Sequence, residues 1–135
     1  MTQILDLMAN LQAEYNTSII LITHDMGVVS EFADHILVMY AGDVVEYGDV
    51  ESIFEHPCHP YTRGLLKSIP RLDQEMNELY TIQGIVPELD KMPTGCRFSN
   101  RCPECDAHCL VNRPPLFETG SQKVRCWRFE KESAK

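Results

Sequence analysis

The stretch that decides the fold is IILITHDMGVVSEFADHILVMYAGDVVEYGD, residues 19–49. It opens with four consecutive apolar residues that run directly into Thr23, His24 and Asp25. A short apolar run of this kind predicts a buried strand over residues 18–23. A buried strand that ends in polar side chains is typical of the ligand-binding edge of an α/β sheet. His24 is therefore the first candidate for a site residue.

Helix and strand patterns alternate on both sides of this strand. Apolar residues recur at helical spacing before it, and two strand-like runs joined by a turn follow it. Asp25 is a candidate N-cap for the helix that comes next. The elements predicted besides the strand are a helix over residues 3–14, a short helix after Asp25, two strands over 35–49 joined by a turn at Ala41-Gly42-Asp43, and short helices over 49–57 and 59–70. This pattern indicates an α/β fold.

The character of the chain changes after Pro70. Residues 71–79 have the composition of a polar helix or a linker, and residues 79–84 have the pattern of a strand. From Pro87 onward prolines and cysteines dominate, and no hydrophobic period is clear. We therefore predict two parts, residues 1–70 and a small irregular, cysteine-rich subdomain at 71–135.

Composition excludes several classes of protein. The chain has 135 residues, 44% of them apolar, which is enough for a packed core. Its net charge of −8 argues against binding to nucleic acid, since such binding needs a basic surface. No apolar run is long enough to span a membrane, and the acidic N-terminal stretch does not have the pattern of a signal peptide. These features predict a cytoplasmic protein that reaches a membrane only through a partner.

Cysteines form the second candidate site. Five of the six fall between residues 96 and 126, and four thiolates around one centre suit zinc or an iron–sulfur cluster. Spacing alone also allows a half-site made of Cys102 and Cys105, with His108 or Cys109 completing it. Reduced structural cysteines and disulfides are the alternatives, although a cytosolic setting disfavours disulfides. The clustered cysteines are Cys96, Cys102, Cys105, Cys109 and Cys126, and Cys58 lies apart.

No glycine-rich phosphate loop accompanies His24, because neither G-x-x-x-x-G-K-[ST] nor G-x-G-x-x-G occurs in the chain. Three motifs nevertheless point to one family. Residues 19–49 resemble the segment that follows the Walker B motif in ABC-transporter ATPase subunits. HPYTRGLLKSIP at 59–70 and GCRFSNRCP at 95–103 are similar to segments of the oligopeptide and dipeptide importer branch.

This resemblance implies a fold, an activity and a set of partners. The fold would be the C-terminal piece of a RecA-like ATPase core, with the Walker A, signature and Walker B motifs upstream of the matching segment. His24 corresponds to the switch histidine near the γ-phosphate of ATP, and ATP with Mg²⁺ would be cofactors of the intact subunit only. A second nucleotide-binding subunit and a membrane permease would be partners on the inner face of the cell membrane. We expect the chain alone to be inactive as an ATPase and to self-associate through uncovered apolar faces.

The resemblance also selects among the cysteines. It implies that Cys96, Cys102, Cys109 and Cys126 hold a [4Fe–4S] cluster, with zinc as the alternative, and it leaves Cys105 and Cys58 as extra thiols. We expect His35, His56 and His59 to be structural or solvent-facing rather than catalytic. The function predicted is part of the ATPase that energises peptide import. The alternatives are a non-enzymatic iron–sulfur or zinc module and an importer subunit for nickel or another non-peptide substrate.

Overall fold

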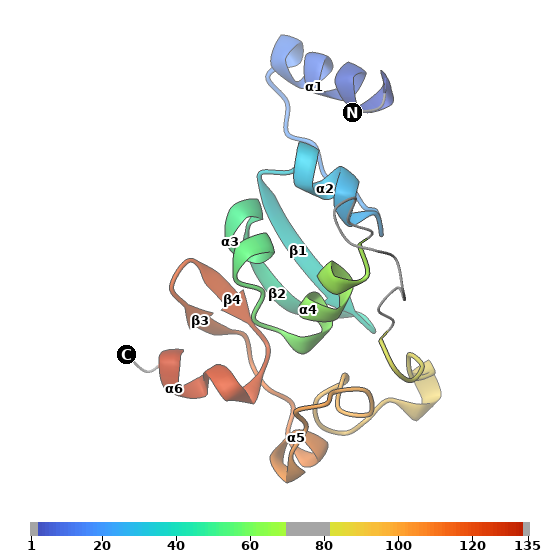
Figure 1. Ribbon diagram of the computed structural model, residues 1–135, viewed down its shortest axis with the longest axis vertical. Coiled ribbons are helices and arrows are strands. Elements are labelled where there is room, and N and C mark those ends of the chain that lie inside the picture. Colours follow the sequence, from blue (N-terminus) through green and yellow to red (C-terminus); the bar gives the residue numbers. More distant parts are fainter. Residues whose placement is uncertain (1–2, 70–81, 134–135) are drawn as a thin grey trace, which may run out of the picture.

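A computed structural model describes residues 3–69 and 82–133. Its centre is an antiparallel four-stranded sheet in the order β1-β2-β4-β3 (Figure 1). The sheet joins strands that are far apart in the sequence, because β2 pairs with β4. The strands are β1 His35–Tyr40, β2 Asp43–Asp49, β3 Phe117–Thr119 and β4 Gln122–Val124.

The β1–β2 hairpin confirms the two strands predicted over residues 35–49. Its two-residue turn has positive φ angles at Ala41 (49°) and Gly42 (83°), which is the backbone that matches the twist of paired strands. Every second side chain of β1 is buried. Opposite Val38 and Met39 the register skips Val45, so that β2 carries one extra residue and Val45 and Glu46 are both buried.

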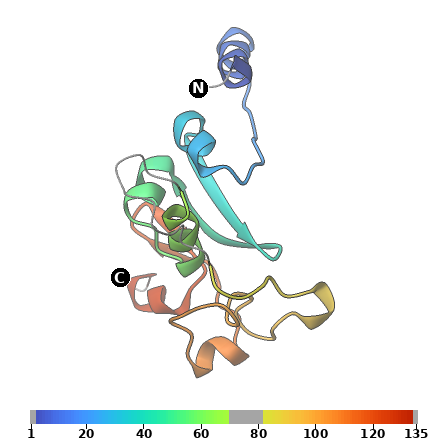
Figure 2. The same cartoon turned by 45° about the vertical axis from the view of Figure 1, so that its right-hand side comes forward.

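Two short helices follow the hairpin and confirm the helices predicted over 49–57 and 59–70. Helix α3 (Val50–Glu55) is capped by Asp49, whose carboxylate accepts a hydrogen bond from the Ser52 N–H. Helix α4 (Pro60–Lys67) is capped by His59. The helices lie against the hairpin in both views (Figures 1 and 2). The core between these elements consists of Ile36, Val38, Tyr40, Val45, Ile53 and Phe98.

The first part of the chain confirms two predicted helices and corrects the predicted strand. Helix α1 (Gln3–Tyr15) matches the helix predicted over 3–14, and α2 (Met26–Phe32) is capped by Asp25. Residues 18–23 form no strand, and Ile20 and Ile22 are 91% and 93% exposed. An extended segment becomes a strand only where a neighbour accepts its backbone hydrogen bonds, and no described residue pairs with this one.

The C-terminal half is mostly irregular, as its sequence predicts. Its elements other than β3 and β4 are the short helices η1 (Leu89–Lys91), α5 (Ala107–Val111), η2 (Trp127–Phe129) and α6 (Glu130–Ser133). The polar helix or linker predicted at 71–79 lies outside the described residues, as does most of the strand predicted at 79–84, whose described part (82–84) is not a strand. The fold class is therefore mixed helix and antiparallel sheet.

None of the helices within residues 3–69 and 82–133 has the length and apolar character needed to cross a membrane.

Candidate functional site: a pocket lined by four cysteines

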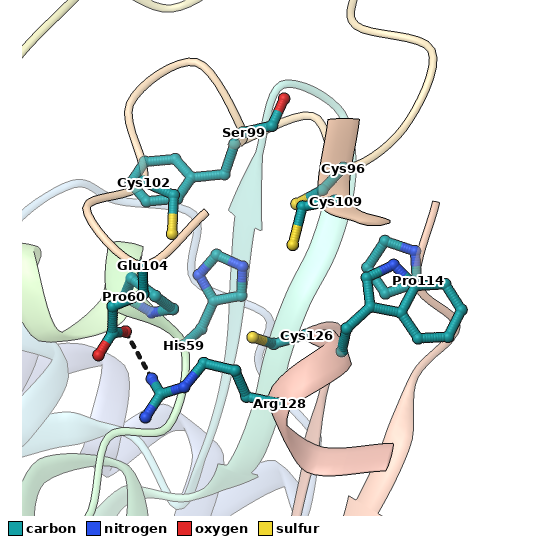
Figure 3. Close-up of a pocket in the computed structure, with 12 residues that line it drawn as sticks. His59, Pro60, Cys96, Ser99, Cys102, Glu104, Cys109, Pro114, Cys126 and Arg128 are labelled. Carbon is teal, nitrogen blue, oxygen red and sulfur yellow. Dashed lines mark hydrogen bonds and ion pairs between the residues drawn. The ribbon is translucent and has the colours of Figure 1, made fainter. Parts of the chain in front are cut away.

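One pocket collects the four cysteines that the family resemblance selects. Cys96, Cys102, Cys109 and Cys126 all line it, and their sulfur atoms point into the same space (Figure 3). Neither Cys105 nor Cys58 lines this pocket. All six cysteines are free thiols. The structure thus brings together residues that are up to 30 positions apart in a region without hydrophobic periodicity.

Local hydrogen bonds place the sulfurs. The Cys96 N–H donates to the Cys109 carbonyl at 2.8 Å, which ties the first cysteine to helix α5. Gly95 permits this approach, because a Cβ atom at that position would lie 2.2 Å from the same carbonyl oxygen. The Cys102 N–H donates to the Phe98 carbonyl and so closes a tight turn between the first two cysteines. Cys126 lies immediately before η2.

Burial keeps these thiols protonated. Desolvation raises the pKa of Cys102 and of Cys109 to about 11, and it also raises the pKa of Cys96 and of Cys126. A metal centre needs thiolates, so the binding of one would displace protons from these side chains. Within the described ranges no set of three or more His, Cys, Asp or Glu side chains is arranged to hold a single metal ion.

A carboxylate with two arginines closes one side of the pocket. Glu104 lies between the second and third lining cysteines and accepts hydrogen bonds from Arg63 at 2.6 Å and from Arg128 at 2.5 Å. These ion pairs connect α4, the cysteine loop and η2, which are distant in sequence. Figure 3 shows Arg128 and Glu104 joined by this interaction among the residues that line the pocket. The arginines offset the negative charge of Glu104 beside the thiols.

The sequence analysis missed the buried carboxylate of Glu46, which is bonded to the backbone of the pocket residue His59. Glu46 is fully buried on β2, and its carboxylate accepts hydrogen bonds from the N–H groups of Cys58 and His59. Burial raises the pKa of Glu46. The extra residue at Val45 lets the neighbouring side chains of Val45 and Glu46 both be buried.

His59 confirms the expectation of a structural role and adds a second feature. It is 2% exposed, and its Nδ1 atom accepts a hydrogen bond from the Tyr61 N–H at 3.0 Å, which caps α4. Burial lowers the pKa of His59 to about 3, so the ring is neutral. The same ring lines the cysteine pocket. No motif in the sequence indicated that the HPYT turn and the cysteines share one site.

The structure places His24 elsewhere. Its side chain is exposed at the end of the extended segment, one residue before the cap of α2. The Asp25 N–H donates to the Thr23 hydroxyl across His24, which fixes the local bend. His24 does not line the cysteine pocket. The two candidate sites of the sequence analysis are therefore separate, and the role of His24 stays a prediction.

Comparison with known proteins identifies the relatives. Residues 45–109 match the family model described as oligopeptide/dipeptide transporter, C-terminal region. The chain is 51% identical over 98% of its length to the oligopeptide transport ATP-binding protein AppD of Bacillus subtilis. It is 50% identical over 91% of its length to the oligopeptide transport ATP-binding protein OppD of Salmonella typhimurium, and 44% identical over 92% to the dipeptide transport ATP-binding protein DppD of Haemophilus influenzae.

These matches show that the chain is related throughout its length to the ATP-binding proteins of transporters. Within that class, it belongs to the oligopeptide/dipeptide transporter family, and it includes the C-terminal region of that family. The chain spans 36% to 40% of the length of these three relatives.

Proposed function

We propose that this chain is part of the subunit that hydrolyses ATP to drive the import of peptides. The observation that carries the proposal is the 51% identity to a transport ATP-binding protein over 98% of the chain. ATP and Mg²⁺ are the cofactors of this function. A membrane permease and a second nucleotide-binding subunit are its partners, at the cytoplasmic face of the membrane. In this account residues 1–70 complete a RecA-like core, and residues 71–135 form a cysteine-rich subdomain.

His24 is the residue of this chain that acts on ATP in the proposed function. It is exposed, and the Asp25 cap and the Thr23 hydroxyl hold the backbone on either side of it. An imidazole held in this way can donate a hydrogen bond to the γ-phosphate as negative charge develops there. An interaction of that kind stabilises the transition state more than the bound nucleotide, so it affects turnover more than binding.

We propose further that Cys96, Cys102, Cys109 and Cys126 hold a [4Fe–4S] cluster. Support comes from the donor set, since four thiols from separate segments point into one pocket. Four thiolates also suit a tetrahedral zinc site, so zinc is the alternative occupant. A [4Fe–4S] cluster would supply electron-transfer chemistry or a structural cross-link.

A chimeric subunit tests the transport proposal. The matching C-terminal part of the Bacillus subtilis relative is replaced by this chain, and ATP hydrolysis of the purified chimera is measured. We expect turnover close to that of the parent subunit. The matched control is the same chimera with His24→Ala, which should bind ATP normally and lose turnover. A folded chimera that binds ATP but does not hydrolyse it would contradict the proposal.

A further inference from the structure

His59 is held in a single orientation beside the four sulfurs. Its backbone N–H donates to Glu46 Oε1 at 2.7 Å, and the side chain is 2% exposed. The ring packs on Phe98 with a centroid separation of 5.5 Å, and Phe98 lies between the first two lining cysteines. Together with the cap on α4, these contacts leave the ring no room to rotate out of the pocket wall.

The cap also decides where the ring proton lies. Nδ1 accepts the Tyr61 N–H, so Nδ1 carries a lone pair, and the proton of a neutral ring must be on Nε2. The two nitrogens of an imidazole point in widely different directions. Nε2–H is therefore directed away from the start of α4. Nδ1 is committed to the cap, so Nε2–H is the donor that the neutral ring has left.

The cysteine pocket offers sulfur acceptors to this donor. His59 lines it together with all four candidate ligands, and Figure 3 shows the imidazole standing among their sulfur atoms. A neutral thiol is a weak acceptor, whereas a metal-bound thiolate or a bridging sulfide carries negative charge and accepts strongly. A sulfur that becomes anionic when the pocket is filled would thus be a strong acceptor for Nε2–H.

We propose that His59 is a positioning residue that donates its Nε2–H to a sulfur atom of the group held by the four cysteines. The inference rests on the proposed [4Fe–4S] site and adds a residue that sets the reduction potential of the group bound there. A hydrogen bond to a cluster sulfur stabilises the reduced state, which carries more negative charge. His59 therefore raises the reduction potential of the bound group, and Glu46 assists by fixing the backbone that carries the ring.

Two substitutions separate this donor role from the helix cap. In His59→Asn the side-chain oxygen takes the place of Nδ1 and still caps α4, but nothing replaces Nε2–H. In His59→Gln the longer side chain places an amide N–H near the position of Nε2, but the cap is lost. Each full 135-residue variant is reconstituted anaerobically with Fe²⁺ and sulfide, its iron is counted, and its reduction potential is measured. Thermal unfolding of the empty proteins reports the cap.

We expect His59→Asn to shift the reduction potential to a more negative value while keeping the stability of the empty chain. His59→Gln should do the reverse, with a potential near that of the unsubstituted protein and a lower unfolding temperature. Equal potentials for the Asn variant and the unsubstituted protein, both loaded with iron, would overturn the role of His59 and leave the cluster proposal intact. An unsubstituted chain that takes up no iron would overturn both.

Nuclear magnetic resonance of the unsubstituted chain provides a test that needs no variant. Long-range ¹H–¹⁵N spectra distinguish a protonated ring nitrogen from an unprotonated one. We expect the His59 proton on Nε2 in the empty protein, with its resonance shifted on loading. A proton on Nδ1 would overturn the proposal directly.

Discussion

Removal of the Glu46 carboxylate should lower the stability of the fold around the cysteine pocket. This side chain is fully buried, and it accepts hydrogen bonds from the N–H groups of Cys58 at 3.0 Å and His59 at 2.7 Å. Gln122 Nε2 donates a third, weaker bond at 3.3 Å, which links β4 to the same carboxylate. Glu46 therefore holds β2, β4 and the turn before α4 together.

The magnitude follows from the groups left without partners. In Glu46→Ala the buried N–H of His59 and the partly buried N–H of Cys58 lose their acceptor, at about 1 to 3 kcal/mol each. We expect a loss of about 3 kcal/mol in the free energy of unfolding, since part of the turn can relax toward water. Glu46→Gln keeps one acceptor oxygen for the His59 N–H and presents an amide N–H to the Cys58 N–H. Its cost should be about half as large.

Urea denaturation of the reduced chain at pH 7, followed by circular dichroism, measures both changes. Glu55→Gln is the matched control, because Glu55 is exposed at the end of α3, and a surface change of this kind alters stability by less than about 0.5 kcal/mol. If Glu46→Ala cost no more than this control, the reasoning about the buried carboxylate would be refuted.

The stabilities of the unsubstituted chain and of Glu46→Gln should also depend differently on pH, because only the former has a carboxyl group that titrates at this position. Burial raises the pKa of Glu46 above its unfolded value, so the folded chain binds the proton more tightly than the unfolded chain does. The stability that this group contributes is therefore fully present below pH ~4.3 and is lost as the pH rises through the raised value. The difference in unfolding free energy between the unsubstituted chain and Glu46→Gln should be larger at pH 4 than at pH 7.

Three further outcomes are expected. Cys→Ser at Cys96 or Cys126 should abolish iron loading, whereas the same change at Cys105 should leave it unaltered; equal loading of all three variants in an iron assay would exclude the proposed ligand set. In a full-length chimera, His24→Ala should lower ATP turnover by a factor on the order of 10² to 10³ while nucleotide affinity is kept, and unchanged turnover would remove His24 from the mechanism. The chain should self-associate through the exposed apolar face of α1, so that Leu7→Glu lowers the mass found by light scattering; a monomer at all concentrations would contradict this.

Local patterns predicted the elements that local interactions determine. The hairpin over 35–49 followed from two strand-like runs around a turn at Ala41-Gly42-Asp43, and the capping of α2 followed from Asp25 at the start of a helical pattern. The strand predicted over 18–23 was wrong, because a strand depends on a partner that its own sequence does not specify. The short strands β3 and β4 are three residues each, too short for any period to be detected.

The candidate site was predictable only in part for the same reason. The resemblance selected four cysteines, and these four line one pocket while Cys105 does not. Nothing in the spacing alone made that choice, since the approach of Cys96 to α5 depends on Gly95 and a backbone hydrogen bond. His59 and Glu46 reach the site through a bulge and a turn, which are features of tertiary structure that hydrophobic periodicity does not encode.

Peptide uptake by living cells tests the central claim most directly. Bacillus subtilis cells that depend on the chimeric ATP-binding subunit would be given a labelled oligopeptide, and its accumulation would be compared with that in cells carrying the His24→Ala chimera. The account predicts accumulation close to that of the parent strain for the chimera and background accumulation for the variant. Equal, background accumulation in both, with the chimeric subunit present at normal levels, would contradict the claim that this chain works in ATP-driven peptide import.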